Sequence, residues 1–566
     1  MSVIKGQGSG EVSTGFYPYS IEQSLRFNDP DNPYLYRTPS SQGNLTTFTL
    51  SFWFKRSVLG SYQEIFHEYP GSGERSQILF MNNDTLKVEL EAGNTNHFLT
   101  NMVFRDTSAW YNIVVVFNSG DSTSTNRVKI YVNGVDQADT ANGGGGFSTA
   151  NYPSQSATSG FNRTNQHEIS TYDGSDYHLD GYLAEVNFID GTALTASSFG
   201  ETIDNIWVPK EYSTSDGAYG TNGFYLKFVS GAIGTDSSGN GNNWTHSAGN
   251  ASRNRTVQDS PTNNFNVIQL TNTSVLAYEH QGMRVNTART GNWDGAVGSF
   301  SVKSGKWYYE VQLNVGSSDN FRCVPGWKQA PEEAEKVFNG LGSTGDPFGT
   351  GSGDLGNTGH YAYQSWNPQF YGNGGYTGTS ISASSGDVIN VAVDFDNNKI
   401  YFGKNGTYIA NDGGTDGDPA NGTNESLSGL LDNGKFYSPS VALRSDGTTG
   451  SNSVRFNFGS DRSFGANFSL GTAYADENGF GEFRYEVPSG FLALCTQNLP
   501  DVDIIDGTEN FNTVLYTAAS SNGTYNITGN GFQPDFSWVK NRNDVERHFL
   551  FDSVRGNTSM TDKFLV

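Results

Sequence analysis

The sequence predicts an all-β fold made of tandem antiparallel β-sandwiches, and three observations support this prediction. Charged residues make up 16% of the 566 residues, against roughly 25% in an average globular protein. Glycine is abundant, with 69 residues, and aromatic residues reach 13%, a composition typical of short strands joined by many turns. Finally, residues 386–406 alternate between apolar and polar side chains with a period of two.

The segment 386–406 is predicted to form a β-hairpin. Its first half places Ile389, Val391 and Val393 on one face, and Asp-Asn-Asn then supplies turn residues before the strand Lys-Ile-Tyr-Phe. The apolar face of this hairpin must be covered by another sheet. Residues 110–134 repeat the same order of strand, turn and Lys-Ile-Tyr strand, so the two copies predict two sandwich domains in tandem.

The spacing of the strand-like segments divides the chain into five parts. These are an N-terminal arm or anchor at residues 1–20, a first sandwich at 21–210, a polar connector at 211–265, a second sandwich at 266–500 and the start of a third β unit at 501–566. A segment as short as the last one rarely closes a sandwich by itself. We therefore expect that a partner chain completes it, or that the natural chain continues past Val566.

The first sandwich carries a recognisable series of segments. LSFWFKR, AWYNIVVVF, RVKIYVNG and DGYLAEVNFIDGTAL follow one another in this order. Together they resemble a laminin-G-like, concanavalin A-type jelly roll that covers residues 21–210. The resemblance implies that Trp53, Trp110 and Tyr131 are core residues, and that Glu185 belongs to the last strand rather than to a catalytic pair.

The second sandwich resembles a SPRY-type domain. The segments SGKWYYEVQL, GDVINVAVDFDNNKIYFGKNG, FYSPSVAL and VRFNFG carry this resemblance, and they occur in the order that the family shows. Residues 340–359 depart from a compact SPRY domain because they include eight glycines, which indicates an inserted flexible loop.

Composition excludes several classes of partner. The chain has 34 Lys+Arg against 58 Asp+Glu, and the net charge of −24 repels phosphate backbones, so we expect no nucleic-acid binding. No run of about 18 apolar residues occurs, so we expect no membrane insertion. The N-terminus lacks an apolar signal core. Cys323 and Cys495 lie in apolar strand-like runs, and two buried free thiols are favoured over one long-range disulfide.

We find no convincing catalytic constellation and predict that the protein is not an enzyme. Glycan hydrolysis needs two carboxylates across a cleft. The pairs Glu482 with Glu486 and Asp394 with Asp396 have suitable spacing, but a solvated strand face and a turn explain them more simply. No Gly-x-Ser-x-Gly elbow, Walker loop or dinucleotide fingerprint stands in the required setting.

Two segments carry candidate metal ligands, although no cofactor is required. The first includes Asp236, Ser238 and Asn240, whose alternating oxygens could wrap calcium, with an Asx-rich turn as the favoured alternative. The second is a denser set before the closing strand of the first sandwich, where zinc or calcium could bind, with a solvated acidic loop as the favoured alternative. Its members are His167, Glu168, Asp173, Asp176, His178 and Asp180.

Aromatic residues gather beside amides and glycines in residues 360–376, a pattern that suits sugar faces and peptide backbones. The SPRY resemblance implies that some of these rings are core. The candidate ligand-binding residues are Tyr363, Trp366, Phe370, Tyr371 and Tyr376.

A laminin-G-like unit, a SPRY-type unit and a final segment with GFQPDFSWVKNR and FDSVRG together resemble large virion proteins of tailed phages, including those of marine bacteriophages and cyanophages. This resemblance implies a virion protein made in the host cytoplasm and released by lysis. We predict a non-enzymatic tail fibre or surface appendage that contributes to host attachment by binding glycan or protein. The alternatives are a purely architectural capsid or tail component, and a surface-polysaccharide depolymerase. The expected partners are other virion proteins, copies of the chain in a homo-oligomer with a trimer favoured, and a host cell-surface glycan or protein.

Overall fold

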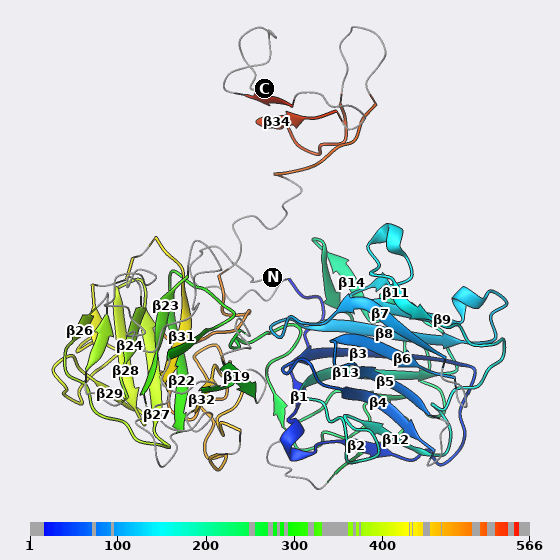
Figure 1. Cartoon of the computed structure of the whole chain (residues 1–566), viewed down its shortest axis with the longest axis horizontal. Helices are drawn as coiled ribbons and strands as arrows, with labels where there is room; N and C mark the ends of the chain where they lie inside the picture. Colours follow the sequence, from blue (N-terminus) through cyan, green and yellow to red (C-terminus); the bar gives the residue numbers. More distant parts are fainter. Residues whose placement is uncertain are drawn as a thin grey trace. The chain divides into compact units, whose positions relative to one another are not determined.

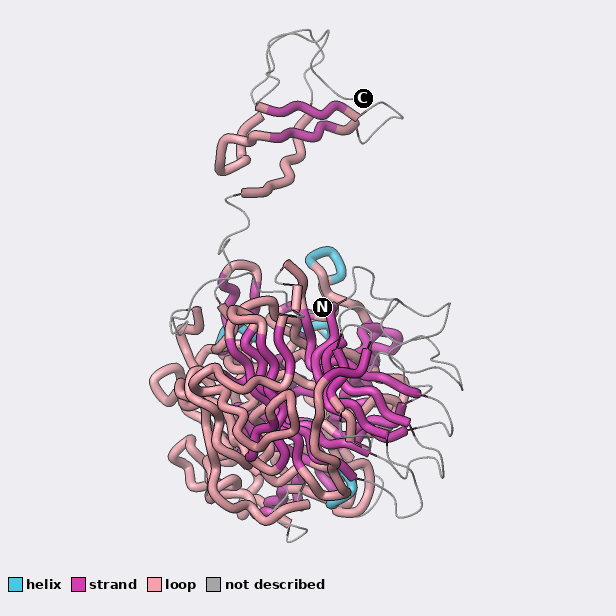
Figure 2. Tube along the Cα trace, turned by 90° about the vertical axis from the view of Figure 1, so that its left-hand side faces the viewer, coloured by secondary structure: helices cyan, strands magenta, loops and turns pink. Residues whose placement is uncertain are grey.

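The fold is all-β, as the sequence predicts. The computed structural model describes residues 16–70, 75–91, 96–247, 255–269, 276–279, 283–287, 293–314, 322–330, 360–365, 369–372, 375–429, 431–432, 434–444, 453–465, 467–500, 510–517, 527–541 and 548–553. Within these ranges the helices are single 3-10 turns, drawn in cyan in Figure 2: η1 (Asp29–Asp31), η2 (Ser124–Asn126), η3 (Thr140–Asn142) and η4 (Ala196–Ser198). The chain divides into one compact unit that ends at Pro500 and a second unit from Asp501 to Val566.

Two antiparallel sheets pack face to face in the first sandwich, whose strands are blue to green in Figure 1. Sheet 1 has the order β10 (Val135–Asp136), β9 (Val128–Val132), β8 (Tyr111–Asn118), β3 (Thr47–Arg56), β13 (Gly181–Asp190), β1 (Ser24–Phe27) and β18 (Thr256–Val257), with β16 (Phe224–Leu226) also paired to β13. Sheet 2 has the order β11 (Phe147–Ala150), β7 (His97–Val103), β6 (Thr85–Glu89), β5 (Ser76–Phe80), β4 (Gln63–Tyr69), β12 (Gln166–Ile169), β2 (Leu35–Arg37) and β17 (Thr245–His246). A separate hairpin pairs β14 (Gly200–Ile203) with β15 (Ile206–Pro209).

The second sandwich also has two sheets. Sheet 3 has the order β19 (Leu276–Glu279), β20 (Arg284–Thr287), β32 (Ser453–Asn457), β22 (Lys306–Asn314), β27 (Val388–Asp394), β28 (Lys399–Lys404) and β29 (Thr407–Ile409), and β30 (Leu427–Ser428) and β33 (Leu492–Ala493) pair with β28 and β22. Sheet 4 has the order β21 (Trp293–Val297), β31 (Tyr437–Arg444), β23 (Arg322–Gln329), β24 (His360–Tyr363), β25 (Phe370–Gly372) and β26 (Gly375–Thr377).

The hairpin predicted over 386–406 is confirmed as β27 and β28. Val391 pairs with Phe402, and Asn398 in the connecting turn has a φ of 55°. Ile389, Val391 and Val393 are fully buried in the core between sheets 3 and 4, because the period of two places them on one face.

The two aspartates of this hairpin stabilise its turn and connect the hairpin to residues 305–306. The Asp394 carboxylate accepts hydrogen bonds from the backbone N–H and side-chain amide of Asn397, and it lies 3.2 Å from Lys306 Nζ. Asp396 accepts a hydrogen bond from the backbone N–H of Gly305. Asp394 is only 1% exposed, so the strand face that we expected to be solvated is covered.

The expectation that Trp53, Trp110 and Tyr131 are core residues is confirmed for Trp53, whereas Trp110 and Tyr131 are partly buried and pack against the margins of buried clusters. On β3 the residues Phe52 and Phe54 face sheet 2, so the alternation of the strand turns Trp53 to the outer face of sheet 1. Trp53 is buried there, and Trp110 packs beside it. Tyr131 packs against a separate apolar cluster on the same outer face.

Residues 211–265 are not a connector, because they complete the first sandwich. They add β16 and β18 to sheet 1 and β17 to sheet 2. Phe224, Leu226 and Trp244 lie in the core between the sheets, and the rings of Phe224 and Trp244 meet edge to face with centroids 5.0 Å apart. Polar residues outnumber the apolar ones so strongly in this segment that no periodicity marks its strands.

Buried ion pairs join the end of this segment and the first sandwich to the second. Asp461 lies 2.5 Å from Arg26 Nη1 on β1 and 3.3 Å from Arg255 Nη2, and all three side chains are less than 10% exposed. Arg255 also pairs with Glu482 at 3.1 Å, and Arg462 pairs with the same carboxylate. Glu482 is therefore a structural residue of this network.

Cys323 and Cys495 are both free thiols and both buried, as the sequence favours. Burial raises the pKa of each thiol above its ordinary value, so neither is a ready nucleophile. Among the described residues no helix has the length and apolar character needed to cross a membrane.

The unit from Asp501 to Val566 contains an antiparallel pair, β34 (Phe536–Val539) and β35 (Phe549–Asp552). Phe536 and Trp538 share one face of β34 and are 56% and 63% exposed.

Candidate functional site

The predicted ligand-binding rings of the second sandwich are not surface groups where the structure describes them. Tyr363 and Phe370 lie in the core between sheets 3 and 4, and Tyr371 on the opposite face of β25 is equally buried, each with no exposed surface. The prediction that these three rings contact a ligand is therefore wrong, because a ring without exposed surface cannot stack on one. Trp366 and the side chain of Tyr376 lie outside the described residues.

The predicted calcium segment forms a hydrogen-bonded turn. The carboxylate of Asp236 accepts hydrogen bonds from the backbone N–H groups of Tyr225, Ser238 and Asn242 and from the Ser238 hydroxyl. Ser238 Oγ in turn accepts a hydrogen bond from the backbone N–H of Asn240. These donors occupy the oxygens that a cation would need, so the structure supports the Asx-turn alternative.

The second set of predicted metal ligands is dispersed. His167 is buried on β12, where its Nδ1 donates to the Asn165 carbonyl and its Nε2 accepts from the Asn162 N–H, and burial lowers the pKa of His167 to about 3. The His178 ring donates from Nδ1 to the Ser170 carbonyl. Asp173 and Asp176 are exposed, while Asp180 is buried. In the part of the chain that the structure describes, no three His, Cys, Asp or Glu residues are grouped to hold a metal ion.

The loop that carries these residues covers an aromatic surface on sheet 2. Its residues Tyr172 and Tyr177 lie over the outer face of the sheet, where the Tyr172 ring lies tilted against His67 with ring centroids 4.7 Å apart. Tyr177 lies 5.8 Å from Tyr172 and 5.2 Å from Tyr62. We call this surface the tyrosine face, and it comprises Tyr34, Tyr36, Tyr62, Tyr172 and Tyr177.

The rings of the tyrosine face remain available to solvent. Tyr62 and Tyr177 are 37% and 45% exposed, and the other three are half-buried. The Tyr34 hydroxyl adjoins the tip of the loop, because a methyl group added to Gly174 would lie 3.4 Å from it. Rings from β2, from the start of β4 and from the loop therefore converge on one surface.

A row of polar side chains lies beneath these rings. Strand pairing places Tyr36 opposite Glu168, Glu168 opposite His67, and His67 opposite Gln77, which is opposite Glu89 in turn. This row points away from the core because its neighbours Phe66 and Ile78 face sheet 1. Glu168, His67, Gln77 and Glu89 are all less than 5% exposed, which is unusual for the outer face of a sandwich.

The loop itself holds an uncommon backbone. Ser170, Asp173 and Tyr177 have φ values of 73°, 57° and 56°, in a backbone region that residues other than glycine rarely adopt. The backbone N–H of Glu64 donates a hydrogen bond to the Tyr177 carbonyl at 2.7 Å and so holds the loop in this conformation. Strain of this kind concentrates at binding sites, where the surrounding structure must hold it.

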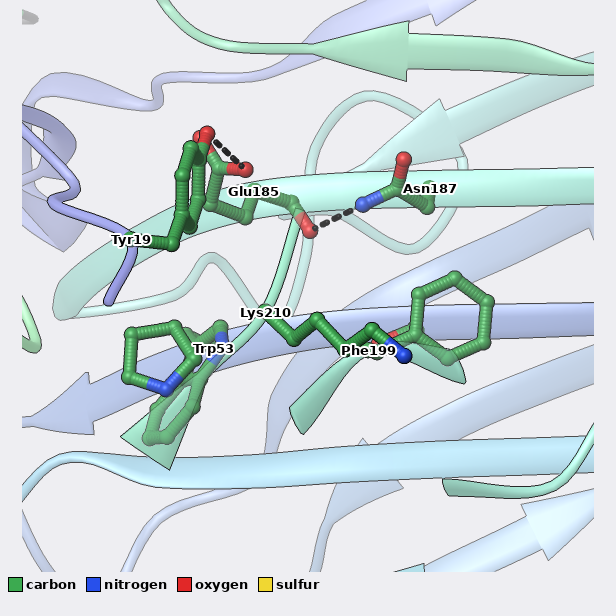
Figure 3. A pocket seen from close by; sticks show the side chains of 8 residues that line it. Tyr19, Trp53, Glu185, Asn187, Phe199 and Lys210 are labelled. Atoms are coloured by element: carbon green, nitrogen blue, oxygen red, sulfur yellow. Dashed lines mark hydrogen bonds between the residues drawn. The ribbon is translucent and has the colours of Figure 1, made fainter. Parts of the chain in front are cut away.

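A second candidate lies on the outer face of sheet 1 (Figure 3). A cavity of about 10 Å³, of the order that one water molecule needs, is lined by Tyr19, Trp53, Glu185 and Lys210 among others. Glu185 lies on β13, where the register with β3 shifts, and it has a φ of 52°. Its carboxylate accepts hydrogen bonds from the hydroxyls of Tyr19 and Tyr225.

This cavity lies where the N-terminal arm meets the sandwich, and it is too small for a substrate. Tyr19 belongs to the arm, and two residues later Ile21 is held by hydrogen bonds with Ser260 and Thr262. Burial raises the pKa of Glu185 from 4.5 to about 7, although the hydrogen bonds from Tyr225 and Tyr19 oppose the shift. We therefore regard Glu185 as a residue that fastens the arm.

Replacing Glu185 by glutamine should remove a pH dependence of stability. A raised pKa means that the folded state favours the neutral acid, so the stabilisation is complete below pH 4.5 and is lost as the pH rises through about 7. Between pH 4.5 and about pH 7, the free energy of unfolding of the wild-type protein should fall by on the order of 3 kcal/mol relative to that of Glu185→Gln. Denaturant unfolding of both proteins at several pH values measures this, and parallel curves would show that Glu185 does not titrate this way.

Comparison with known proteins agrees with the two sandwich types. Residues 31–198 match the family described as the concanavalin A-like lectin/glucanases superfamily, and residues 306–418 match the SPRY domain. Residues 506–563 match a domain of unknown function. The chain therefore contains a laminin-G-like domain and a SPRY domain. No curated protein sequence matches the chain.

Several solved structures are similar to parts of the chain. The SPRY domain of human HERC1 is 17% identical over 33% of this chain and 92% of its own, with a TM-score of 0.23. A proposed carbohydrate-binding protein from Bacteroides ovatus is 16% identical over 31% of this chain, with a TM-score of 0.22, and the match spans 46% of that protein. A heptameric SAP-like pentraxin from Limulus polyphemus is 17% identical over 31% of this chain and 80% of its own, with a TM-score of 0.22.

Proposed function

We propose that the protein is a non-enzymatic attachment protein of a tailed-phage virion, and that its first sandwich binds a glycan of the host surface on the tyrosine face. The observation that carries the binding role is the group of solvent-accessible rings above a polar row. Aromatic rings stack on the apolar faces of sugars, while amides and hydroxyls bind their hydroxyl groups. The half-buried Gln166, whose side chain donates to Glu168, adds an amide next to the polar row.

The carboxylates beneath the rings favour binding over hydrolysis. Glu89 accepts hydrogen bonds from Gln77 and Lys87, each at 2.6 Å. Glu168 is engaged by Gln166 and lies 3.8 Å from His67 Nδ1. A pair of catalytic carboxyl groups must instead be free to reach the glycosidic bond from both sides.

The virion assignment rests on the resemblance of the ordered segments to tailed-phage proteins. We propose that copies of the chain associate, with a trimer favoured, and that other virion proteins hold the assembly. Localising the protein in purified particles tests this directly, because a tail-tip position supports attachment and a capsid-lattice position supports the architectural alternative. Release of reducing sugar from host polysaccharide would instead support a depolymerase.

Removing the rings of Tyr172 and Tyr177 should weaken binding to host cells or to their surface polysaccharide by about tenfold or more, which corresponds to roughly 1.4 kcal/mol. The loss is expected because both rings are accessible and neither belongs to the core. Binding of fluorescently labelled protein to cells measures it.

The matched control is Ile206→Ala, which removes a 52% exposed apolar side chain from the β14–β15 hairpin instead. This variant should bind as the wild-type protein does. Equal binding by the control and the double variant Tyr172→Ala/Tyr177→Ala would exclude the tyrosine face as the site.

A further inference from the structure

The charged groups around the tyrosine face are largely neutralised within the protein. Lys87 Nζ lies 2.6 Å from Glu89 Oε2, and the two side chains are 17% and 3% exposed. His67 Nδ1 lies 3.8 Å from Glu168 Oε2, and these two side chains are 0% and 2% exposed. A ligand on the rings above therefore meets few free charges of these strands.

Glu64 and Arg75 are two further groups that add little free charge to the tyrosine face. Burial raises the pKa of Glu64 well above its ordinary value, against the influence of Arg75 and Lys87, and so favours the neutral form of this carboxyl. Arg75 lies over the Tyr172 ring at 5.7 Å from its centroid and donates a hydrogen bond to the Tyr172 hydroxyl at 3.1 Å. The guanidinium thus holds a ring of the site in place and has fewer donors left for an acidic ligand.

The exposed charge beside the rings is acidic. Asp173 and Asp176 are exposed on the loop between Tyr172 and Tyr177. The whole chain also carries a net charge of −24. Both features repel a polyanionic ligand, and the repulsion acts over roughly 10 Å at about 0.1 M salt.

The rings form a series longer than one sugar. Tyr62, Tyr177 and Tyr172 follow one another with centroid separations of 5.2 and 5.8 Å. Each ring is about the size of one pyranose, so a row of three suits several units of a chain. The hydroxyl groups of the tyrosines can accept and donate hydrogen bonds, and the Gln166 amide donates to Glu168 in the polar row beneath.

We propose that the tyrosine face takes an uncharged glycan, a chain of neutral pyranose units, rather than an acidic polysaccharide. This inference rests on the proposed glycan-binding function and names the class of ligand for that site. Affinity comes from ring stacking and from hydrogen bonds between uncharged groups, and ionic attraction contributes little.

The test is binding of the full chain to a glycan array that presents neutral, acidic and amino-sugar oligosaccharides, with titration of the best ligand of each class. We expect binding in the neutral class, with an affinity that changes less than about twofold between about 50 and about 500 mM NaCl, since uncharged contacts are not screened. Tyr172→Ala/Tyr177→Ala should weaken that affinity about tenfold. Tyr177→Phe keeps the ring and should retain most of it.

Three results would overturn the inference, and they differ in what else they overturn. Binding confined to acidic or amino-sugar glycans, with an affinity that falls steeply as salt is added, contradicts the neutral class while it preserves glycan binding. Binding to neutral glycans that the double variant leaves unchanged moves the site away from the tyrosine face. Absence of binding to every class and to host cells overturns the proposed function itself. Ile206→Ala serves as the control for folding and array background.

Discussion

Replacing Asp461 by alanine is expected to lower the free energy of unfolding by about 3–5 kcal/mol. The substitution leaves the guanidinium groups of Arg26 and Arg255 buried without their shared carboxylate. It also removes the acceptor for the backbone N–H groups of Ser463 and Gly465. Guanidinium-induced unfolding followed by tryptophan fluorescence measures the loss.

The same carboxylate should make the protein sensitive to acid. Burial by itself raises its pKa, but Arg26 and Arg255 hold the pKa of Asp461 well below its ordinary value of 3.8. A depressed pKa contributes stability that is present above the ordinary value and is lost as the pH falls through the folded-state value. The difference in stability between wild type and Asp461→Ala should therefore shrink in strong acid.

A surface ion pair provides the control for Asp461. Glu211 lies 3.2 Å from Lys227 Nζ, and the two side chains are 46% and 35% exposed. Glu211→Ala should change stability by less than about 1 kcal/mol because solvent screens this pair. If Asp461→Ala is as mild as this control, the buried network does not stabilise the contact between the sandwiches.

Replacing Trp244 by alanine should lower the free energy of unfolding by about 3–5 kcal/mol, the range observed for truncating large aromatic side chains in a close-packed core. Trp244 is 5% exposed and packs against Phe66 on β4 and Phe224 on β16, with centroids 5.9 and 5.0 Å away. The substitution leaves a cavity between the sheets that these rings cannot fill. Thermal and denaturant unfolding of the full chain measure the effect.

This substitution separates two descriptions of residues 211–265. If the segment were the polar connector that its composition suggests, losing one side chain would change stability by less than about 0.5 kcal/mol. Ile206→Ala, on an exposed hairpin, should show such a small effect. A large loss confined to Trp244→Ala identifies the segment as part of the first sandwich.

The predictable parts of the fold are those set by local alternation. The β27–β28 hairpin and the long strand β13 follow from runs of apolar residues with turn residues between them. Segments with isolated apolar residues could not be predicted this way. Leu226 and Trp244 enter the core only because distant strands form the space that receives them.

The candidate site shows the same limit. The dense group of polar residues at 167–180, for which the sequence favours a solvated acidic loop over a metal site, lies on and beside the loop that carries Tyr172 and Tyr177. His178 fixes this loop through Ser170, and the loop places two rings of the proposed binding surface, Tyr172 and Tyr177, over the sheet. No spacing in the sequence connects Tyr36, Tyr62 and Tyr177, since they come from three separate segments.

The sequence by itself determined the fold class, the two domain types and the free state of Cys323 and Cys495. The fold class depends on composition and on a period of two, which are local properties of the chain, and the domain types depend on ordered segments that resemble known families. Only the tertiary structure decided which strand faces are covered, and which side chains meet across them. Strand register brings Glu168, His67 and Gln77 into one row, and register is fixed by the burial of the opposite face of the sheet, which requires contacts between residues far apart in the sequence.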